Sequence, residues 1–327
     1  MSPVDHAPSL KTQASSPKTH APASLKLVSS DLQQALLALR NKDGGWGYYA
    51  GKSSRLEPTC WALLALARQA GATLDIGALR GWPRQDDCLV DTPGTPINYA
   101  FNALAALTLL QNPDGAVLAT PIAGRIVVAK GVRLEQATAL RQDNSLQAWP
   151  WIDQTFSWVE PTAYCLLLLK KMRQNAPGTS TPSLKPPAAS LPAGADERIR
   201  VGERMLLDRA CQTGGWNYGG SNVYGQELWA YVPTTALALL AMQDRRDDPV
   251  VAKSLQYLQK DAATEKSAPA LAVSLICLRV FGIQAPSFEQ ELIPRLDLSR
   301  ALGSTVALAM SLYALADTRH GMAAFTL

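Results

Sequence analysis

The sequence lacks the motifs of the common metal- and phosphate-dependent enzymes. Its 327 residues include only three histidines, His6, His20 and His320. None of its five cysteines forms a Cys-x-x-Cys pair. There is also no thioester motif, no glycine loop of the phosphate-binding type and no Ser-His-Asp order. Because no complete ligand set can be assembled, we expect neither a metal ion nor another cofactor.

Long apolar runs and strong charge are also missing. No stretch reaches the roughly 18 apolar residues of a membrane-spanning helix, and no signal-peptide core is present near the start. The net charge is only +4, with scattered basic residues, which argues against nucleic acid as a partner. Cys60, Cys165 and Cys277 lie inside apolar runs, where a free thiol packs as a small hydrophobic group. We therefore expect a cytoplasmic protein and leave peripheral membrane contact and a protein partner open.

Two segments have compositions unlike the rest. Residues 1–28 are rich in Pro, Ser, Thr, Ala and Lys and show almost no apolar periodicity, which predicts a disordered tail. Residues 174–196 are similar and are interpreted as a flexible insertion. The remainder, residues 29–320, is predicted to form one domain.

A repeat organises this domain. The segments GGWGYYAGKSSRLEPTCWALLALA (44–67) and WPWIDQTFSWVEPTAYCLLLLK (149–170) both continue from a tryptophan, after eleven residues, into Glu-Pro-Thr and an apolar run. A third copy, TGGWNYGGSNVYGQELWAYVPTTALALLAM (213–242), has a longer gap. Proline favours the first turn of a helix, so Pro58, Pro161 and Pro233 are predicted to mark helix starts. The recurrence predicts a repeat protein.

Each repeat is predicted to hold an outer amphipathic helix, a Gly/Trp loop and an inner apolar helix. Helices that are apolar all round must be covered on every side, which a closed ring achieves. The predicted fold is therefore all-α, an α/α toroid of about six helix hairpins. The inner helices are expected at 57–70, 97–110, 161–172, 233–243, 269–281 and 302–316.

The three repeats resemble those of the prenyltransferase and squalene-cyclase family, whose fold is an α/α toroid. The resemblance covers roughly residues 30–320 and includes an approximate glutamine-to-tryptophan motif in Gln212, Gly214 and Trp216. It implies a hydrophobic isoprenoid ligand, terpenoid or prenyl, that is bound or transformed in a central cavity. The alternative is a non-catalytic toroid that acts as a lipid-binding or protein-interaction module.

The chain departs from this family where the chemistry would be carried out. Squalene-type cyclases protonate their substrate with a DxDD motif, which is absent here, and the matching positions read LEPT, VEPT and YVPT. Glu57 and Glu160 are then the candidate catalytic acids, against the simpler interpretation that they only support helix starts. Asp86, Asp87 and Asp91 resemble a magnesium-binding stretch, but the surrounding prolines favour a solvated loop.

Aromatic residues just before the inner helices are candidates for substrate binding, against ordinary core packing. The candidates are Trp149, Trp151, Phe156, Trp158, Trp229 and Tyr231. Tryptophan and glutamate also suit sugars, so a carbohydrate-active toroid is a third alternative. Two carboxylates in one cleft would distinguish it.

Overall fold

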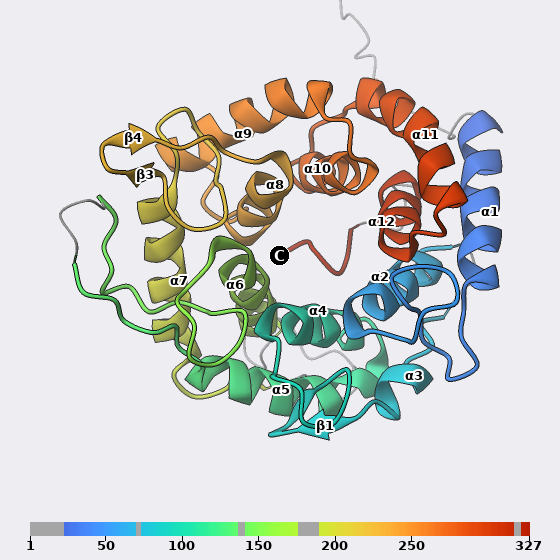
Figure 1. Ribbon diagram of the computed structural model, residues 1–327, viewed down its shortest axis with the longest axis horizontal. Helices are drawn as coiled ribbons and strands as arrows, with labels where there is room; N and C mark the ends of the chain where they lie inside the picture. The colour runs from blue at the N-terminus through green and yellow to red at the C-terminus, as the bar shows by residue number, and fades with distance from the viewer. Residues whose placement is uncertain (1–22, 70–72, 137–140, 176–189, 317–321) are drawn as a thin grey trace, which may run out of the picture.

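The computed structural model describes residues 23–69, 73–136, 141–175, 190–316 and 322–327, and its helices form two concentric rings (Figure 1). The inner ring consists of α2 (Leu56–Ala67), α4 (Tyr99–Leu109), α6 (Val159–Gln174), α8 (Val232–Ala241), α10 (Ala268–Val280) and α12 (Thr305–Leu315). The outer layer consists of α1 (Ala23–Ala38), α3 (Gly77–Arg80), α5 (Ala116–Val128), α7 (Ala195–Arg209), α9 (Pro249–Asp261) and α11 (Pro286–Ala301).

The inner ring is closed. Each inner helix packs against the next, and α12 packs against α2. This confirms the predicted α/α toroid. All six inner helices lie where the apolar runs predicted them, with ends shifted by a few residues. Helix α1 begins at Ala23, inside the segment predicted as a tail.

Strands are a minor part of the described residues. Two short antiparallel hairpins pair β1 (Arg84–Gln85) with β2 (Cys88–Leu89) and β3 (Asn222–Val223) with β4 (Gln226–Glu227). Single 3-10 turns occur at Pro113–Gly115 and Ala262–Thr264. In the part of the chain that is described, no helix is long and apolar enough to cross a membrane.

The two layers bury different amounts of side chain. The inner helices are buried almost all round, whereas α9 buries only Val251, Ser254 and Leu258, which lie on one face of the helix. The apolar runs lie in the inner ring because there each helix buries its surface against neighbours on both sides.

The repeat tryptophans join each loop to both layers. The indole N–H groups of Trp46, Trp149 and Trp216 donate to carbonyl oxygens of α1, α5 and α7 at 2.7, 2.8 and 2.6 Å. Their backbone N–H groups donate to the hydroxyls of Thr59, Thr162 and Thr235 on the inner helices. All six groups are buried, and a buried donor without a partner is costly, so these bonds fix the loop between its two helices.

The third repeat is shifted by one residue from the sequence alignment. Matching the letters Pro-Thr pairs Thr234 with Thr59 and Thr162, but Thr235 is the residue that binds the tryptophan. Pro233, the second residue of α8, then occupies the position of Glu57 and Glu160. The longer loop before α8 made the helix start uncertain from sequence.

This assignment predicts a specific loss of stability at Thr235. Replacing Thr235 by valine should leave the Trp216 amide unpaired in the core and lower the free energy of unfolding by about 1–3 kcal/mol. Thr235→Ser keeps the hydroxyl and is the matched control. Urea unfolding of both variants tests this, and equal stabilities would show that the bond contributes nothing.

The loops also connect neighbouring repeats. The first amide of α4 donates to the Trp151 carbonyl, that of α6 to Tyr218, and that of α12 to Tyr48, at 2.9, 2.9 and 3.0 Å. Each acceptor lies two residues after a repeat tryptophan. The bond from Thr305 to Tyr48 links the last inner helix to the first repeat. The starts of these inner helices therefore lie at one end of the ring, which we call the mouth.

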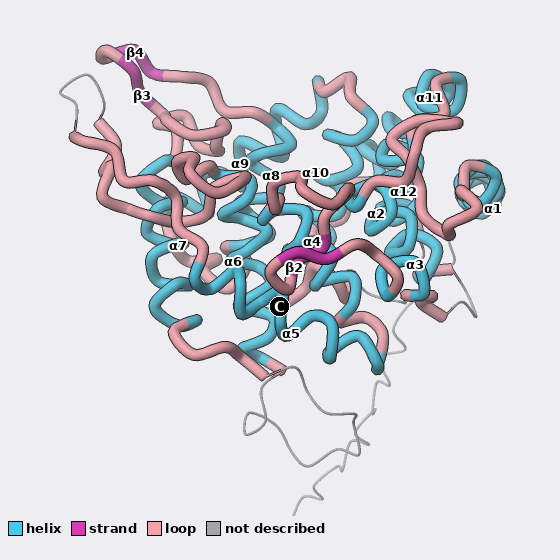
Figure 2. Tube along the Cα trace, turned by 60° about the horizontal axis from the view of Figure 1, so that its bottom comes forward, coloured by secondary structure: helices cyan, strands magenta, loops and turns pink. Residues whose placement is uncertain are grey.

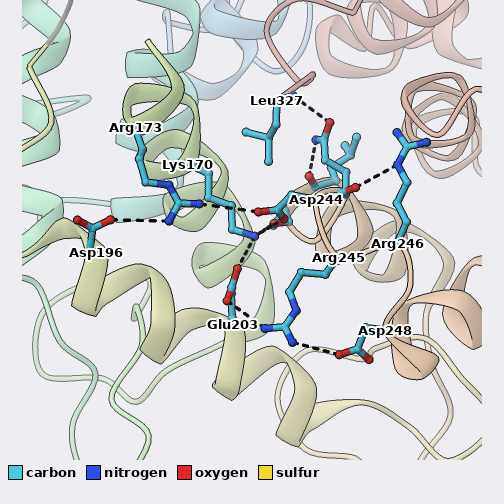
Figure 3. Close-up of polar contacts among 12 residues, drawn as sticks. Lys170, Arg173, Asp196, Glu203, Asp244, Arg245, Arg246, Asp248 and Leu327 are labelled. Atoms are coloured by element: carbon cyan, nitrogen blue, oxygen red, sulfur yellow. Dashed lines mark hydrogen bonds and ion pairs between the residues drawn. The ribbon is translucent and has the colours of Figure 1, made fainter. Parts of the chain in front are cut away.

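At the opposite end of the ring, a buried cation joins α6, α7 and the turn after α8 (Figure 3). The Lys170 ammonium lies 2.7 Å from Glu203, 2.5 Å from Asp244 and 2.9 Å from the Ala241 carbonyl oxygen. Its side chain is only 1% exposed. Arg245 pairs with the second oxygen of Glu203 at 3.1 Å. The charge is thus fully compensated inside the core.

Candidate active site at the mouth of the ring

The second residue of each inner helix lies at the mouth. In α2, α6, α8, α10 and α12 this residue is partly exposed between two buried neighbours. The six residues at this position are Glu57, Ala100, Glu160, Pro233, Pro269 and Val306. Two of them are acids, and the small Ala100 lies between them on α4. At this position the mouth therefore carries the carboxyl groups of Glu57 on α2 and Glu160 on α6, and Asp91 adds a third carboxylate at the start of α2.

Glu57 is held by a tyrosine. The Tyr48 hydroxyl donates to Glu57 Oε2 at 2.6 Å. Burial raises the pKa of Glu57, the hydrogen bond from Tyr48 lowers it, and the charge of Asp91 raises it further. A donor aimed at one oxygen favours the ionised carboxylate. Tyr48 was not recognised from sequence, although its place two residues after Trp46 repeats at Trp151 and Tyr218.

Glu160 lies in a different environment. Burial raises its pKa to about 7, and the nearby charge of Glu57 adds to this effect. Two carboxyl groups that sense each other's charge ionise one after the other, and the group without a stabilising donor keeps its proton longer. The hydrogen bond from Tyr48 thus favours the ionised form of Glu57 against the effect of burial, whereas burial raises the pKa of Glu160 to about 7 without such a donor.

Aromatic side chains surround the start of α6. Phe156 and Trp158 have ring centroids 4.6 Å apart, and Tyr218 and Tyr231 are 5.1 Å apart. The Tyr218 carbonyl accepts the first amide of α6, so the loop that carries Tyr218 lies against the start of this helix. Phe156, Tyr218 and Tyr231 are 41%, 51% and 47% exposed. Large aromatic faces left open to solvent beside titratable groups are typical of ligand sites.

Of the other predicted binding residues, Trp229 and Trp151 are at least partly exposed and Trp149 is buried. Trp229 is 78% exposed, beyond Tyr231 in the loop before α8. Trp151 packs edge-on against Phe101 at 5.9 Å and is partly exposed. Trp149 is fully buried, and its indole N–H binds the Ile126 carbonyl, so it offers no surface to a ligand.

The aspartate stretch lies on a hairpin rather than a helix. Asp86 and Asp87 form the turn between β1 and β2 with positive φ angles, and Asp91 accepts the first amide of α2 at 2.7 Å. Among the residues that the structure describes, no group of three or more His, Cys, Asp or Glu could hold a metal ion.

Two cavities border α2, one at each end of the helix. One of about 200 Å³ is lined by Leu56, Asp91 and Phe101 at the starts of α2 and α4. A larger one, of about 370 Å³, lies at the other end of α2 beside Arg68 and Tyr313. Neither is lined by Glu57 or Glu160, so the carboxylates identify the site by their chemistry rather than by a cavity.

Comparison with known proteins identifies the fold. No protein-family model and no curated protein matches the sequence. Among solved structures, an α-1,6-mannanase of glycoside hydrolase family 76 from a Salegentibacter species shares 9% identity with a TM-score of 0.55, covering 89% of this chain and 99% of its own. It is an inactive variant with two adjacent aspartates replaced by asparagine, in complex with α-1,6-mannotriose. A family 76 mannosidase from Bacteroides thetaiotaomicron shares 9% identity, covering 90% of this chain and 98% of its own, with a TM-score of 0.50.

These neighbours correct the functional predictions made from sequence. The assignment to the prenyltransferase and squalene-cyclase family is wrong, because the neighbours belong to a glycoside hydrolase family. The hydrophobic isoprenoid ligand inferred from that assignment is wrong for the same reason. The alternative of a non-catalytic lipid-binding or protein-interaction module is likewise unsupported, since neither neighbour is such a module. This chain resembles glycoside hydrolases in fold.

Proposed function

We propose that this protein is a carbohydrate-active toroid that hydrolyses a glycosidic bond at the mouth of its ring. The pairing of Glu57 with Glu160 carries this proposal. Glycoside hydrolysis commonly needs one carboxyl group that is protonated at working pH and a second that is ionised. Here the two lie at the same helical position of two inner helices and differ in their environments.

Each carboxyl group has a defined role. Glu160 donates its proton to the glycosidic oxygen as the bond between that oxygen and the anomeric carbon breaks. Glu57, ionised and held by Tyr48, is the second carboxylate and stabilises the positive charge that develops on the sugar. Water supplies the hydroxyl group that ends on the anomeric carbon, and a proton returns to Glu160.

The exposed aromatics would bind the sugar rings. Phe156, Trp158 and Tyr231 lie in the loops that precede α6 and α8 and are at least partly exposed, as are Trp151 and Trp229. Aromatic faces cover the apolar C–H faces of sugars at low entropic cost. Residues 29–320 would act as one domain, and the five buried free cysteines are in keeping with the cytoplasmic location expected from sequence.

The mannotriose in the Salegentibacter structure suggests the first substrates to test. We expect α-1,6-mannotriose to bind, measured by calorimetry, and α-1,6-mannan to be cleaved, measured by chromatography of the products. Maltotriose, an α-1,4-linked glucan of the same length, is the control for linkage. Binding without cleavage would remove the catalytic part of the proposal. Absence of both across a panel of glycans would refute it.

A further inference from the structure

The β3–β4 hairpin presents a tyrosine to solvent at its tip. The strands pair Val223 with Gln226, so the turn between them consists of Tyr224 and Gly225 alone. These two residues have φ angles of +50° and +76°. Two-residue turns of this kind favour asparagine or aspartate followed by glycine, because a bulky L side chain is strained at positive φ. Tyrosine at this position is therefore unfavourable for the turn itself.

The other hairpin of the molecule has the more usual residues. The β1–β2 turn has the same two-residue form, with Asp86 and Asp87 at φ angles of +46° and +66°. Aspartate tolerates this conformation better than tyrosine does. Packing does not offset the strain of Tyr224, because this residue is 81% exposed. A strained residue that contributes little to packing points to a function.

Partly exposed aromatic residues connect the hairpin to the candidate site. Gly219 lies so close to the ring of Trp158 that an added Cβ atom would be 3.2 Å from it. The loop that carries Tyr218 is therefore in contact with Trp158 at the start of α6. The Tyr218 ring meets that of Tyr231, and the chain runs back from Tyr231 through the exposed Trp229 to β4. The hairpin thus continues the aromatic surface of the mouth.

The hairpin is fixed at its base. The Arg141 guanidinium donates to the Ser221 hydroxyl and to Glu227 Oε1, both at 3.2 Å. The Asn222 amide donates to the same carboxylate oxygen at 3.0 Å, and the Leu228 N–H donates to the Ser221 carbonyl at 2.8 Å. Figure 2 shows the hairpin standing clear of the two helix layers, on the side of the ring away from the end of the chain. A ligand would therefore meet side chains that are already positioned.

The hairpin and its flanking residues carry no unpaired charge. Glu227 is the only charged residue between 216 and 231, and it pairs with Arg141 at 3.2 Å. Nucleic acids and anionic membranes are bound by unpaired basic residues, so neither fits this surface. Aromatic rings beside uncharged polar side chains such as Gln226 suit a neutral ligand rich in hydroxyl groups. The rings cover its C–H faces, and the amides bind its hydroxyls.

We propose that the β3–β4 hairpin is a second glycan-binding surface, which holds part of a polymeric substrate at a distance from the bond that is cut. This rests on the proposed hydrolase function. Tyr224 stacks on a sugar ring of that distant part, and Trp229 extends the surface toward the mouth. An oligosaccharide bound only at the mouth does not reach Tyr224. The tyrosine therefore sets a preference for long chains and takes no part in the reaction.

Tyr224→Asn tests this, because it removes the ring and supplies a residue that favours the turn. Its KM for α-1,6-mannan should rise about 10-fold with kcat unchanged, since the lost contact is the same in the ground state and the transition state. Its kinetics with α-1,6-mannotriose should equal those of the wild-type protein. Tyr224→Phe, which keeps the ring, and Asp86→Asn, the matched change in the other hairpin, should both behave as wild type. Equal KM values for mannan in the wild type and Tyr224→Asn would overturn the proposal.

A stability measurement separates binding from a structural role. The urea midpoint of Tyr224→Asn should equal or exceed that of the wild-type protein, because strain in the turn is relieved. A lower midpoint would show that the tyrosine supports the fold and would overturn the proposal.

Binding to mannan keeps the hairpin separate from the hydrolase function. Native gels that contain α-1,6-mannan should retard the wild-type protein more than Tyr224→Asn, whether or not the polymer is cleaved. Equal retardation, in a protein that cleaves mannotriose, would overturn the hairpin proposal alone. A protein that neither binds nor cleaves any glycan would refute the hydrolase function and this proposal with it. A wild-type dimer that Tyr224→Asn converts to a monomer in sedimentation would assign the hairpin to contact between copies and would also overturn the proposal.

Discussion

Replacing Glu160 by glutamine should lower the rate of glycoside cleavage by about 10²- to 10⁴-fold, the range expected when a general acid is lost. The amide has nearly the same shape as the protonated carboxyl group but cannot give up a proton. Binding of α-1,6-mannotriose should therefore persist in the variant. Wild-type activity should fall as pH rises above about 7, because Glu160 then loses its proton. Full activity in Glu160→Gln would remove this residue from the proposed mechanism.

The same substitution should change stability in a pH-dependent way. The pKa of Glu160 is raised from 4.5 to about 7, so the folded protein binds this proton more tightly than the unfolded chain. Wild-type stability should accordingly fall as pH rises from about 4.5 to 7. Above pH 7, Glu160→Gln should be the more stable protein by at most about 3 kcal/mol, and at pH 4.5 the two should be equal. Urea unfolding at both pH values measures this.

An exposed acid provides the control for the stability measurement. Glu197 on α7 is 64% exposed and pairs with Arg200 at the surface. Glu197→Gln should leave the stability nearly unchanged at both pH values. A Glu160→Gln effect of the same size at pH 4.5 and pH 8 would mean that its carboxyl group is not protonated in the folded protein.

Replacing Lys170 by methionine should lower the free energy of unfolding by about 1–3 kcal/mol, because Glu203 and Asp244 lose a charged hydrogen-bond donor but keep Arg245 and Arg173 nearby. Methionine fills the volume of the lysine stem but leaves Glu203 and Asp244 without the ammonium between them. These three side chains join α6, α7 and the turn after α8, so all three elements should loosen together. Urea unfolding and hydrogen exchange of α6 and α7 would show this.

A second substitution tests whether the loss comes from charge. Adding Glu203→Gln to Lys170→Met removes one of the two negative charges left behind and should recover part of the lost stability. Lys260→Met on α9, where the lysine is exposed, is the control for adding methionine. A loss below about 1 kcal/mol in Lys170→Met would show that the network contributes little.

The fold could be predicted from sequence because the apolar runs are long and are separated by recognisable loops. Glu57 and Glu160 could be placed together because their distance from the repeat tryptophan is the same. Thr235 could not, since the loop before α8 is longer and two threonines follow its proline. Tyr48 and Tyr218 were missed because the residue two places after each repeat tryptophan is not the same in every repeat. It is tyrosine in two of them and tryptophan in the third. Lys170 gave no signal, since its partners Glu203 and Asp244 come from the next repeat, more than 30 residues along the chain.

The family was assigned wrongly for a physical reason. The glycine-tryptophan loop and the inner-helix threonine, which suggested that family, hold the loop to both helix layers through the indole and backbone bonds of Trp46, Trp149 and Trp216. These hydrogen bonds stabilise the fold, and they do so whatever molecule the protein binds. Such a motif therefore reports how the chain folds and carries no information about the molecule that is bound.

The bond from the Thr305 amide to the Tyr48 carbonyl has a consequence for how the protein is made. Helix α2 leaves the ribosome early, but the face that will meet α12 stays uncovered until residues 305–315 have been translated. At typical synthesis rates of about 5–20 residues per second, an apolar surface is exposed for many seconds. The ring therefore closes only when the final repeat, with α12, has been made. A nascent chain that stalls before it would present α2 to chaperones or to other partly synthesised chains.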